Sequence, residues 1–171
     1  KQYYISEAKR AASIQINELK KIKKIFNKSF IKAVDLILNC KGKIIFAGIG
    51  KSGLIARKIS ATFSSVGIPS FFCDPAQALH GDMGQIEKKD ILIIFSYSGN
   101  TSELTNMIKY ANRYNIRIIG IASKPDSILL KASDIKLILP KVKESDVTGM
   151  VPTSSTSITL LLGDCLATTV M

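Results

Sequence analysis

Five short apolar segments, rich in β-branched residues and separated by helical patterns, constrain the fold of this chain more than any other feature. They are residues 43–48, 70–73, 91–95, 116–121 and 135–139. Continuous apolar runs of this length are typical of strands buried on both faces, and their alternation with helices indicates a parallel sheet. We therefore predict an α/β fold, a doubly wound five-stranded parallel sheet flanked by helices.

The helical patterns complete this outline. Apolar residues recur at near-helical spacing from Tyr4 to Phe26 with lysines between them, which predicts one long amphipathic helix before the sheet. Further helices are predicted over residues 29–39, 54–66, 75–79, 103–114, 126–132 and 154–170. Because no repeat, low-complexity tract or linker appears, we expect residues 1–171 to form a single domain.

The net charge of +11 raises the question of a nucleic-acid partner. Residues 1–43 hold 11 Lys and Arg against three acids, so most of the surplus lies on the N-terminal helical region. Aromatic residues are not interleaved with these lysines as a base-stacking surface would require. The pattern favours a solvated basic helix face and no nucleic-acid partner, although the charge would attract phosphorylated anions.

Neither a membrane partner nor an oxidising compartment is indicated. The three cysteines (Cys40, Cys73 and Cys165) are odd in number and lack metal-ligand spacing, which is typical of reduced thiols. Residues 1–26 are amphipathic rather than signal-like, and residues 158–166 are too short to span a bilayer. We expect a soluble, cytoplasmic protein.

Three hydroxyl side chains and a glycine follow the third predicted strand, in residues 96–101 (SYSGNT), just before a predicted helix. The first amides of a helix are unpaired and its dipole favours an anion, so hydroxyl donors there suit a phosphate monoester. The plain alternative is a Ser-rich turn with Asn100 as helix cap and Glu103 three residues on. Capping needs only one such side chain, so we favour phosphate binding.

A second loop, Gly48–Gly53 (GIGKSG), follows the first predicted strand. It fits G-x-G-x-x-G, and Asp74 follows about 20 residues later, as a dinucleotide-binding fold would require. A P-loop is excluded because Ile45 stands where its first glycine belongs. Both loops follow parallel strands and should meet at one edge of the sheet, and two hydroxyl-bearing loops suit a small phosphorylated ligand better than a dinucleotide.

Other polar residues have structural alternatives that the sequence leaves open. His80, followed by Gly81, could sit at a helix C-terminus. Glu103 could be a capping-box acid and Glu144 a solvated loop charge. Residues 152–156 (PTSST) open the last helix with a third group of hydroxyls, for which capping is the plain interpretation.

These motifs resemble the sugar isomerase (SIS) domain, and within it the KpsF/GutQ-type arabinose 5-phosphate isomerases. The resemblance rests on residues 40–53 (CKGKIIFAGIGKSG), 56–72 (ARKISATFSSVGIPSFF), 78–84 (ALHGDMG), 96–103 (SYSGNTSE), 152–156 (PTSST) and 163–167 (GDCLA). It implies a flavodoxin-like three-layer sandwich, assembled as dimers or tetramers with sites shared between subunits. It also implies interconversion of D-arabinose 5-phosphate and D-ribulose 5-phosphate, which feeds Kdo synthesis for lipopolysaccharide or capsule.

The resemblance also implies roles for individual residues. The substrate and its phosphate are expected at Gly50, Ser52, Ser96, Ser98, Thr101, Thr153, Ser154 and Ser155. The catalytic groups are expected to be Lys51, His80, Glu103 and Glu144. This chain departs from the family in carrying Asn100-Thr101 where relatives can have an acid and a serine. Full-length relatives continue past the last helix to a further histidine-bearing segment and usually to paired CBS modules.

The expected mechanism is proton transfer through a cis-enediol. Glu103 is the leading candidate for the base, with Glu144 and His80 as acid–base partners and Lys51 stabilising the enediolate oxygen. No metal or organic cofactor is expected, although His80 could bind zinc inhibitorily. Two other classes stay open: a non-catalytic sugar-phosphate sensor of the same fold, and a nicotinamide-dependent dehydrogenase.

Overall fold

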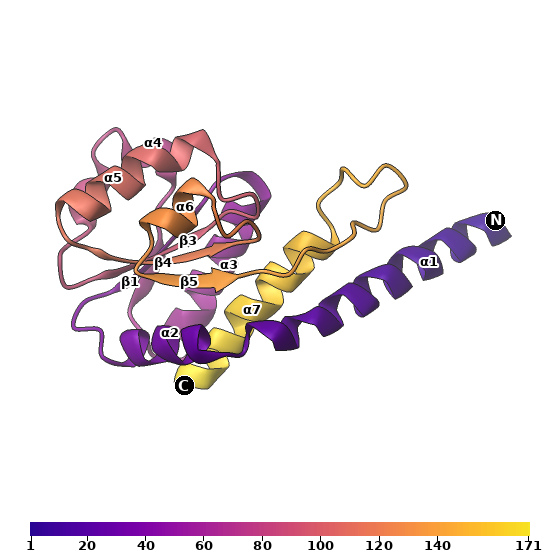
Figure 1. Cartoon of the computed structure of the whole chain (residues 1–171), viewed down its shortest axis with the longest axis horizontal. Helices are drawn as coiled ribbons and strands as arrows, with labels where there is room; N and C mark the ends of the chain where they lie inside the picture. The colour runs from indigo at the N-terminus through magenta and orange to yellow at the C-terminus, as the bar shows by residue number, and fades with distance from the viewer.

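The computed structural model describes all of residues 1–171 and contains one parallel sheet with helices on both faces (Figure 1). The predicted fold class is therefore confirmed. The helices are α1 (Gln2–Leu19), α2 (Lys28–Leu38), α3 (Gly50–Ser65), α4 (Pro75–Ala78), α5 (Thr105–Arg113), α6 (Ile128–Ala132) and α7 (Ser154–Val170). The strands are β1 (Ile44–Gly48), β2 (Ser70–Phe72), β3 (Ile91–Phe95), β4 (Arg117–Ala122) and β5 (Ile135–Ile138). The 3-10 turns are η1 (Lys20–Ile25), η2 (Asp82–Gln85) and η3 (Ser102–Leu104).

The sheet has the strand order β2-β1-β3-β4-β5, and every pair is parallel. Ile44 of β1 is in register with Ser70 of β2 on one side and with Ile91 of β3 on the other. The order reverses between β1 and β3, which is the switch point where ligands of open α/β sheets bind. The loops that leave β1 and β3 therefore lie side by side at the C-terminal edge.

Side chains alternate along each strand between two apolar clusters, one on each face of the sheet. On one face Phe46 and Phe95 pack with residues of α2, α3 and α7, and the Phe46 ring meets the Phe63 ring edge-on with centroids 4.9 Å apart. On the other face Ile45 and Ile94 pack with α4, α5 and α6. Because both faces are covered, the strands carry the continuous apolar pattern seen in the sequence.

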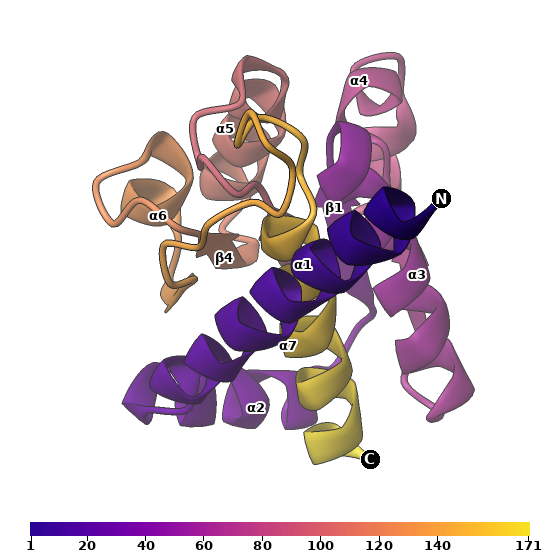
Figure 2. The same cartoon turned by 90° about the vertical axis from the view of Figure 1, so that its right-hand side faces the viewer.

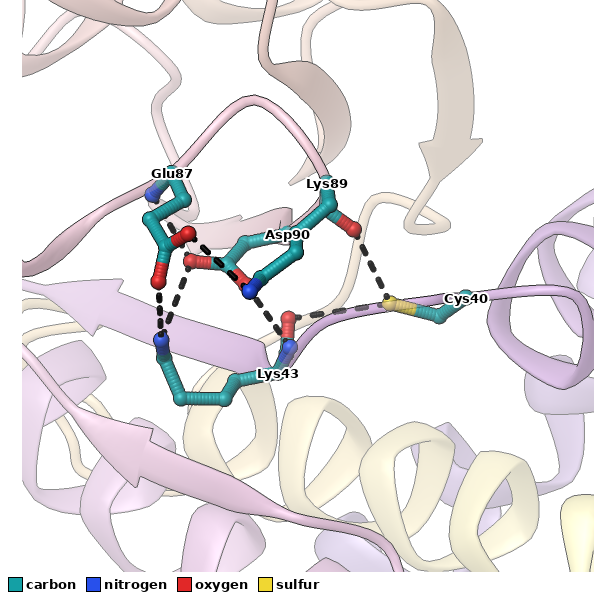
Figure 3. A network of polar contacts seen from close by, with 5 residues as sticks. All are labelled: Cys40, Lys43, Glu87, Lys89 and Asp90. Atoms are coloured by element: carbon teal, nitrogen blue, oxygen red, sulfur yellow. Dashed lines mark hydrogen bonds and ion pairs between the residues drawn. The ribbon is translucent and has the colours of Figure 1, made fainter.

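A buried carboxylate fastens the opposite, N-terminal edge of the sheet (Figure 3). Asp90 is 1% exposed, and its two carboxylate oxygens accept hydrogen bonds from the backbone amides of Lys43 and Glu87, each at 2.8 Å. The Lys43 ammonium lies 3.5 Å from the same carboxylate and 3.4 Å from that of Glu87. These contacts join the starts of β1 and β3.

Helix α1 differs from the other long helices because none of its residues is buried, and only Leu19 at its end packs against the core. The predicted helix from Tyr4 to Phe26 forms, but α1 ends at Leu19 and continues as the 3-10 turn η1. Figures 1 and 2 show α1 crossing α7 and projecting beyond the sheet. Tyr4 is 72% exposed and Ile16 58%, whereas Ile22 and Ile25 of η1 are buried. None of the helices combines the length and apolar character needed to cross a bilayer.

Candidate functional site

A cleft of about 430 Å³ opens at the C-terminal edge of the sheet, at the switch point. Three segments that are far apart in the sequence form it: the start of α3, the loop after β3, and the segment that leads into α7. The expected site residues in its lining are Lys51, Ser52, Ser96, Ser98, Thr101, Glu144 and Ser155. The structure therefore brings these seven together. The positions of the two loops predict this for the five residues that lie in them, whereas Glu144 and Ser155 come from the segment that leads into α7.

The loop after β3 presents both hydroxyl and amide donors. The Ser96 and Thr101 hydroxyls share a hydrogen bond of 2.9 Å, and Ser96 Oγ also accepts from the backbone amide of Gly99 at 3.1 Å. The backbone amides of Ser98 and Thr101 donate to no acceptor in the protein. Unpaired amides beside hydroxyls are suited to the oxygens of a phosphate group.

Helix α6 holds this loop in place. Gly99 has a φ of +69°, and a Cβ there would lie 2.2 Å from the Ser127 hydroxyl, so only glycine fits. Its carbonyl accepts from the amide of Leu129 at 3.0 Å, and the Asn100 side-chain oxygen accepts from the amide of Ile128 at 2.9 Å. Asn100 is thus bound to α6 and does not cap the following helix, which corrects the capping alternative.

Lys51 and Ser52 lie in the first turn of α3, directly after β1. The Lys51 side chain is exposed and forms no ion pair or hydrogen bond within the chain. Lys51 and Ser52 line a cleft whose other wall carries the Glu144 carboxylate. An unpaired cation beside a helix N-terminus favours a negatively charged ligand or reaction intermediate.

Glu144 supplies that carboxylate. Its Oε2 atom accepts from the Thr153 amide at 2.8 Å, the Thr153 hydroxyl at 3.0 Å and the Ser155 amide at 3.3 Å. Partial burial opposes ionisation of Glu144, but the hydrogen bonds from Ser155 and Thr153 outweigh it and hold the pKa below its ordinary value. Glu144 is therefore ionised at neutral pH, and it occupies the amides at the start of α7 where an external anion would otherwise bind.

Glu103 and His80 lie outside the lining of this cleft, although they were expected at the same edge. In η3 Leu104 takes the buried position, so Glu103 is exposed. Its own backbone amide and the Ser102 hydroxyl donate to it and lower its pKa. His80 is exposed and follows the four-residue helix α4, which covers the other face of the sheet.

Three expected binding residues also lie outside the cleft lining. Gly50 borders a neighbouring cleft of about 660 Å³ that includes Asp74. Asp74 accepts from the Ala76 amide at 2.9 Å and so caps α4. One of the carboxylate oxygens that the ribose of a dinucleotide would need is therefore already occupied. Thr153 binds Glu144 instead of facing the cleft, and the Ser154 hydroxyl is fully buried without a hydrogen-bond partner.

The sequence did not single out Tyr97, Met150 or Thr159, which also line the cleft. Tyr97 lies in the hydroxyl-rich loop, and its phenol oxygen accepts from the Val142 amide at 3.1 Å. Burial raises the pKa of Tyr97. Because Tyr97 lies inside the hydroxyl-rich loop, its position in the sequence could have identified it as a cleft residue. For cofactors, no group of three His, Cys, Asp or Glu side chains in the chain is arranged to hold a metal ion.

A cleft lined by hydroxyls, an ammonium and a carboxylate lies at the switch point of a five-stranded parallel sheet, which defines the chain as an open α/β domain. Comparison with known families identifies the family to which this domain belongs. The model of the SIS domain matches residues 37–169, and the chain belongs to the SIS domain family. All of α1 and most of α2 precede the matched range.

The chain is similar to several arabinose 5-phosphate isomerases. It is 40% identical over 159 residues to KdsD of Shigella flexneri, covering 93% of this chain and 48% of that protein. It is 37% identical over 167 residues to GutQ of Salmonella typhi, covering 98% and 52%. The chain thus spans about half the length of the curated relatives it matches.

Solved structures show the same fold. The structure of c3406 from E. coli CFT073 in complex with arabinose 5-phosphate superimposes with a TM-score of 0.95, at 30% identity, over 99% of this chain and 90% of that one. A Listeria monocytogenes protein described as a candidate sugar-phosphate isomerase gives a TM-score of 0.96 at 32% identity, over 100% and 90%.

Proposed function

We propose that this chain is the isomerase domain that interconverts D-arabinose 5-phosphate and D-ribulose 5-phosphate. The observation that carries this proposal is the content of one cleft: a hydroxyl and amide loop at Ser96–Thr101, the unpaired ammonium of Lys51 and the ionised Glu144. The similarity to KdsD and GutQ supports this substrate pair. The reaction would supply a precursor for Kdo in the cytoplasm.

In this proposal the phosphate binds the loop after β3. Ser96, Ser98 and Thr101 would donate their hydroxyls to the phosphate oxygens, and the unpaired amides of Ser98 and Thr101 would donate to them as well. Ser52 and Ser155 line the same cleft and would contribute further donors. Because α6 holds the loop in place before any ligand arrives, little ordering is required on binding.

The reaction moves two protons. A base takes the proton from C2 of the aldose, an enediolate forms, and the proton returns to C1, while the O2 proton passes to O1. Lys51 would stabilise the negative oxygen of the enediolate. Glu144 is ionised and lies in the cleft, so within one chain it is the carboxylate placed to accept a proton.

We propose that Glu103 and His80 act in sites shared between copies of the chain. Both are exposed and outside the cleft of their own chain, so a dimer or tetramer is needed to bring them to a substrate. The exposed Tyr4 and Ile16 of α1 also favour assembly, because paired helices would bury them. In such a site Glu103 keeps the role of leading base and His80 that of acid–base partner.

The proposal is tested by following arabinose 5-phosphate by proton NMR in D₂O. We expect conversion to ribulose 5-phosphate with deuterium entering at C1 of the ketose, the signature of an enediol that exchanges its proton with solvent. Glu144→Gln should lower kcat by about 100-fold, as expected for loss of an acid–base group. The Glu103→Gln variant tests the leading base separately.

A thermal-shift titration with arabinose 5-phosphate and with NAD, read beside the NMR assay, separates the alternatives. Binding of arabinose 5-phosphate without turnover would identify a sensor instead of an enzyme. Thermal stabilisation by NAD and not by the sugar phosphate would support the dehydrogenase. Wild-type turnover by Glu144→Gln would remove Glu144 from the mechanism.

A further inference from the structure

Helix α1 has no buried residue, yet its polar side chains bind the segment that carries Glu144. Arg10 donates to the Ser145 carbonyl at 3.1 Å, and Gln15 Nε2 donates to the Ser145 hydroxyl at 3.3 Å. Glu18 accepts from the Lys143 amide at 3.0 Å. These contacts join residues more than 120 positions apart in the chain, and they lie on either side of Glu144.

Gln15 differs from the other two because it also binds α7. Its Oε1 accepts from the Ser157 hydroxyl at 3.1 Å. The Ser157 amide donates to the Thr153 carbonyl at 2.9 Å, and the Thr153 hydroxyl accepts from the Ser145 amide at 2.9 Å. Gln15, Ser145, Thr153 and Ser157 therefore form a closed ring of hydrogen bonds, which we call the Gln15 ring.

The Glu144 carboxylate is bound to this ring through Thr153, whose amide and hydroxyl both donate to it. Ser145 is 3% exposed and directly follows Glu144 in the chain. Both ends of Glu144, its backbone through Ser145 and its carboxylate through Thr153, thus depend on members of the ring. If the ring opens at Gln15, only the direct contacts of Glu144 and Ser145 with the start of α7 still join the two segments, and the carboxylate is held less firmly.

We propose that Gln15 of α1 is a positioning residue that holds the Glu144 carboxylate at the wall of the cleft through the Gln15 ring. The Gln15 side-chain amide suits this role because its nitrogen donates to Ser145 and its oxygen accepts from Ser157 of α7. One planar group thus joins the two segments. Reaction rates depend strongly on such placement, since a shift of about 1 Å at a reacting group can cost about 100-fold. The catalytic part of this proposal rests on the proposed isomerase function.

The ring itself is tested by amide hydrogen exchange in Gln15→Leu, which keeps the side-chain size and removes both hydrogen bonds. We expect the Thr153 and Ser155 amides to exchange about tenfold faster, as loss of two neutral hydrogen bonds allows. The Phe46 amide in the core should be unchanged. Asn17→Leu on the same helix is the control, because Asn17 is exposed and accepts only from Lys20. Equal exchange in Gln15→Leu and Asn17→Leu would overturn the proposal.

Kinetics test the consequence for the reaction. Gln15→Leu and Ser157→Ala should each lower kcat by about tenfold with KM nearly unchanged, and the double variant should be no slower than either, because both open the same ring. Full kcat in Gln15→Leu, or additive losses in the double variant, would overturn the positioning role. If the wild-type protein neither binds nor converts arabinose 5-phosphate, the proposed function fails, and hydrogen exchange alone then decides whether the Gln15 ring holds Glu144.

Discussion

The sheet and helix α1 use their apolar residues in opposite ways. In the sheet, Phe46 and Ile93 are fully buried between two layers of helices. In α1, Tyr4 and Ile16 are exposed, and the helix is attached to the rest of the chain mainly by polar contacts. Apolar burial therefore holds the scaffold together, whereas hydrogen bonds between distant segments hold one wall of the cleft.

The largest expected effect tests whether the two regions differ in stability. Phe46→Ala should lower the free energy of unfolding by about 4 kcal/mol, because it removes a fully buried ring from the core. The matched variant Ile16→Ala in α1 should change the free energy of unfolding of the monomer by less than about 0.5 kcal/mol, since that side chain is exposed within a single chain. Urea unfolding followed by circular dichroism measures both, and similar losses in the two variants would contradict the comparison.

A smaller effect concerns the loop that joins the sheet to the cleft. Gly99 and Gly149 both have positive φ, but only Gly99 has neighbours where a Cβ would be placed. Gly99→Ala should cost about 3 kcal/mol from backbone strain and overlap with Ser127, and should abolish binding of the sugar phosphate. Gly149→Ala carries the strain alone and should cost about 1 kcal/mol. Equal unfolding midpoints would show that the Ser127 contact does not hold the loop.

The smallest effect lies at Glu144, where the two regions meet. Its folded pKa is lowered, so its ionised form stabilises the protein fully above the unfolded pKa, and this stability is lost as the pH falls through the folded value. The wild type should therefore be more stable than Glu144→Gln at about pH 7, and the difference should shrink as the pH falls below the ordinary glutamate pKa of 4.5 and vanish below the lowered folded value. A difference that stays constant with pH would show that charge is not what holds Glu144 at α7.

The sheet was predictable from sequence because its strands are buried on both faces and carry an unbroken apolar signal. The strand at Ile91–Phe95 was predicted with its observed bounds, and the last helix, Ser154–Val170, was as well. Helix α3 starts at Gly50, four residues before the predicted start, because the turn after β1 leads into it directly. The convergence of the loops after β1 and β3 followed from parallel topology alone.

The contacts of the site were less predictable, since they join segments that are distant in the sequence. The exposure of Glu103 depends on a 3-10 turn that has no distinct sequence signal. Glu144 binds residues nine and eleven positions later, across an irregular loop. The apolar residues of α1 predicted a helix correctly, but periodicity cannot tell whether a partner surface lies within the same chain.

The attachment of Glu144 to α7 has a consequence for how a ligand can lie. The start of α7 is already occupied by the chain's own carboxylate, so that wall repels a dianion, whereas the loop after β3 offers unpaired amides and hydroxyls. If the proposed function holds, a sugar phosphate would have one favourable direction, with its charged tail toward the β3 loop and its uncharged head toward Glu144. The site is thus polarised before anything binds, and molecules acidic at both ends are disfavoured.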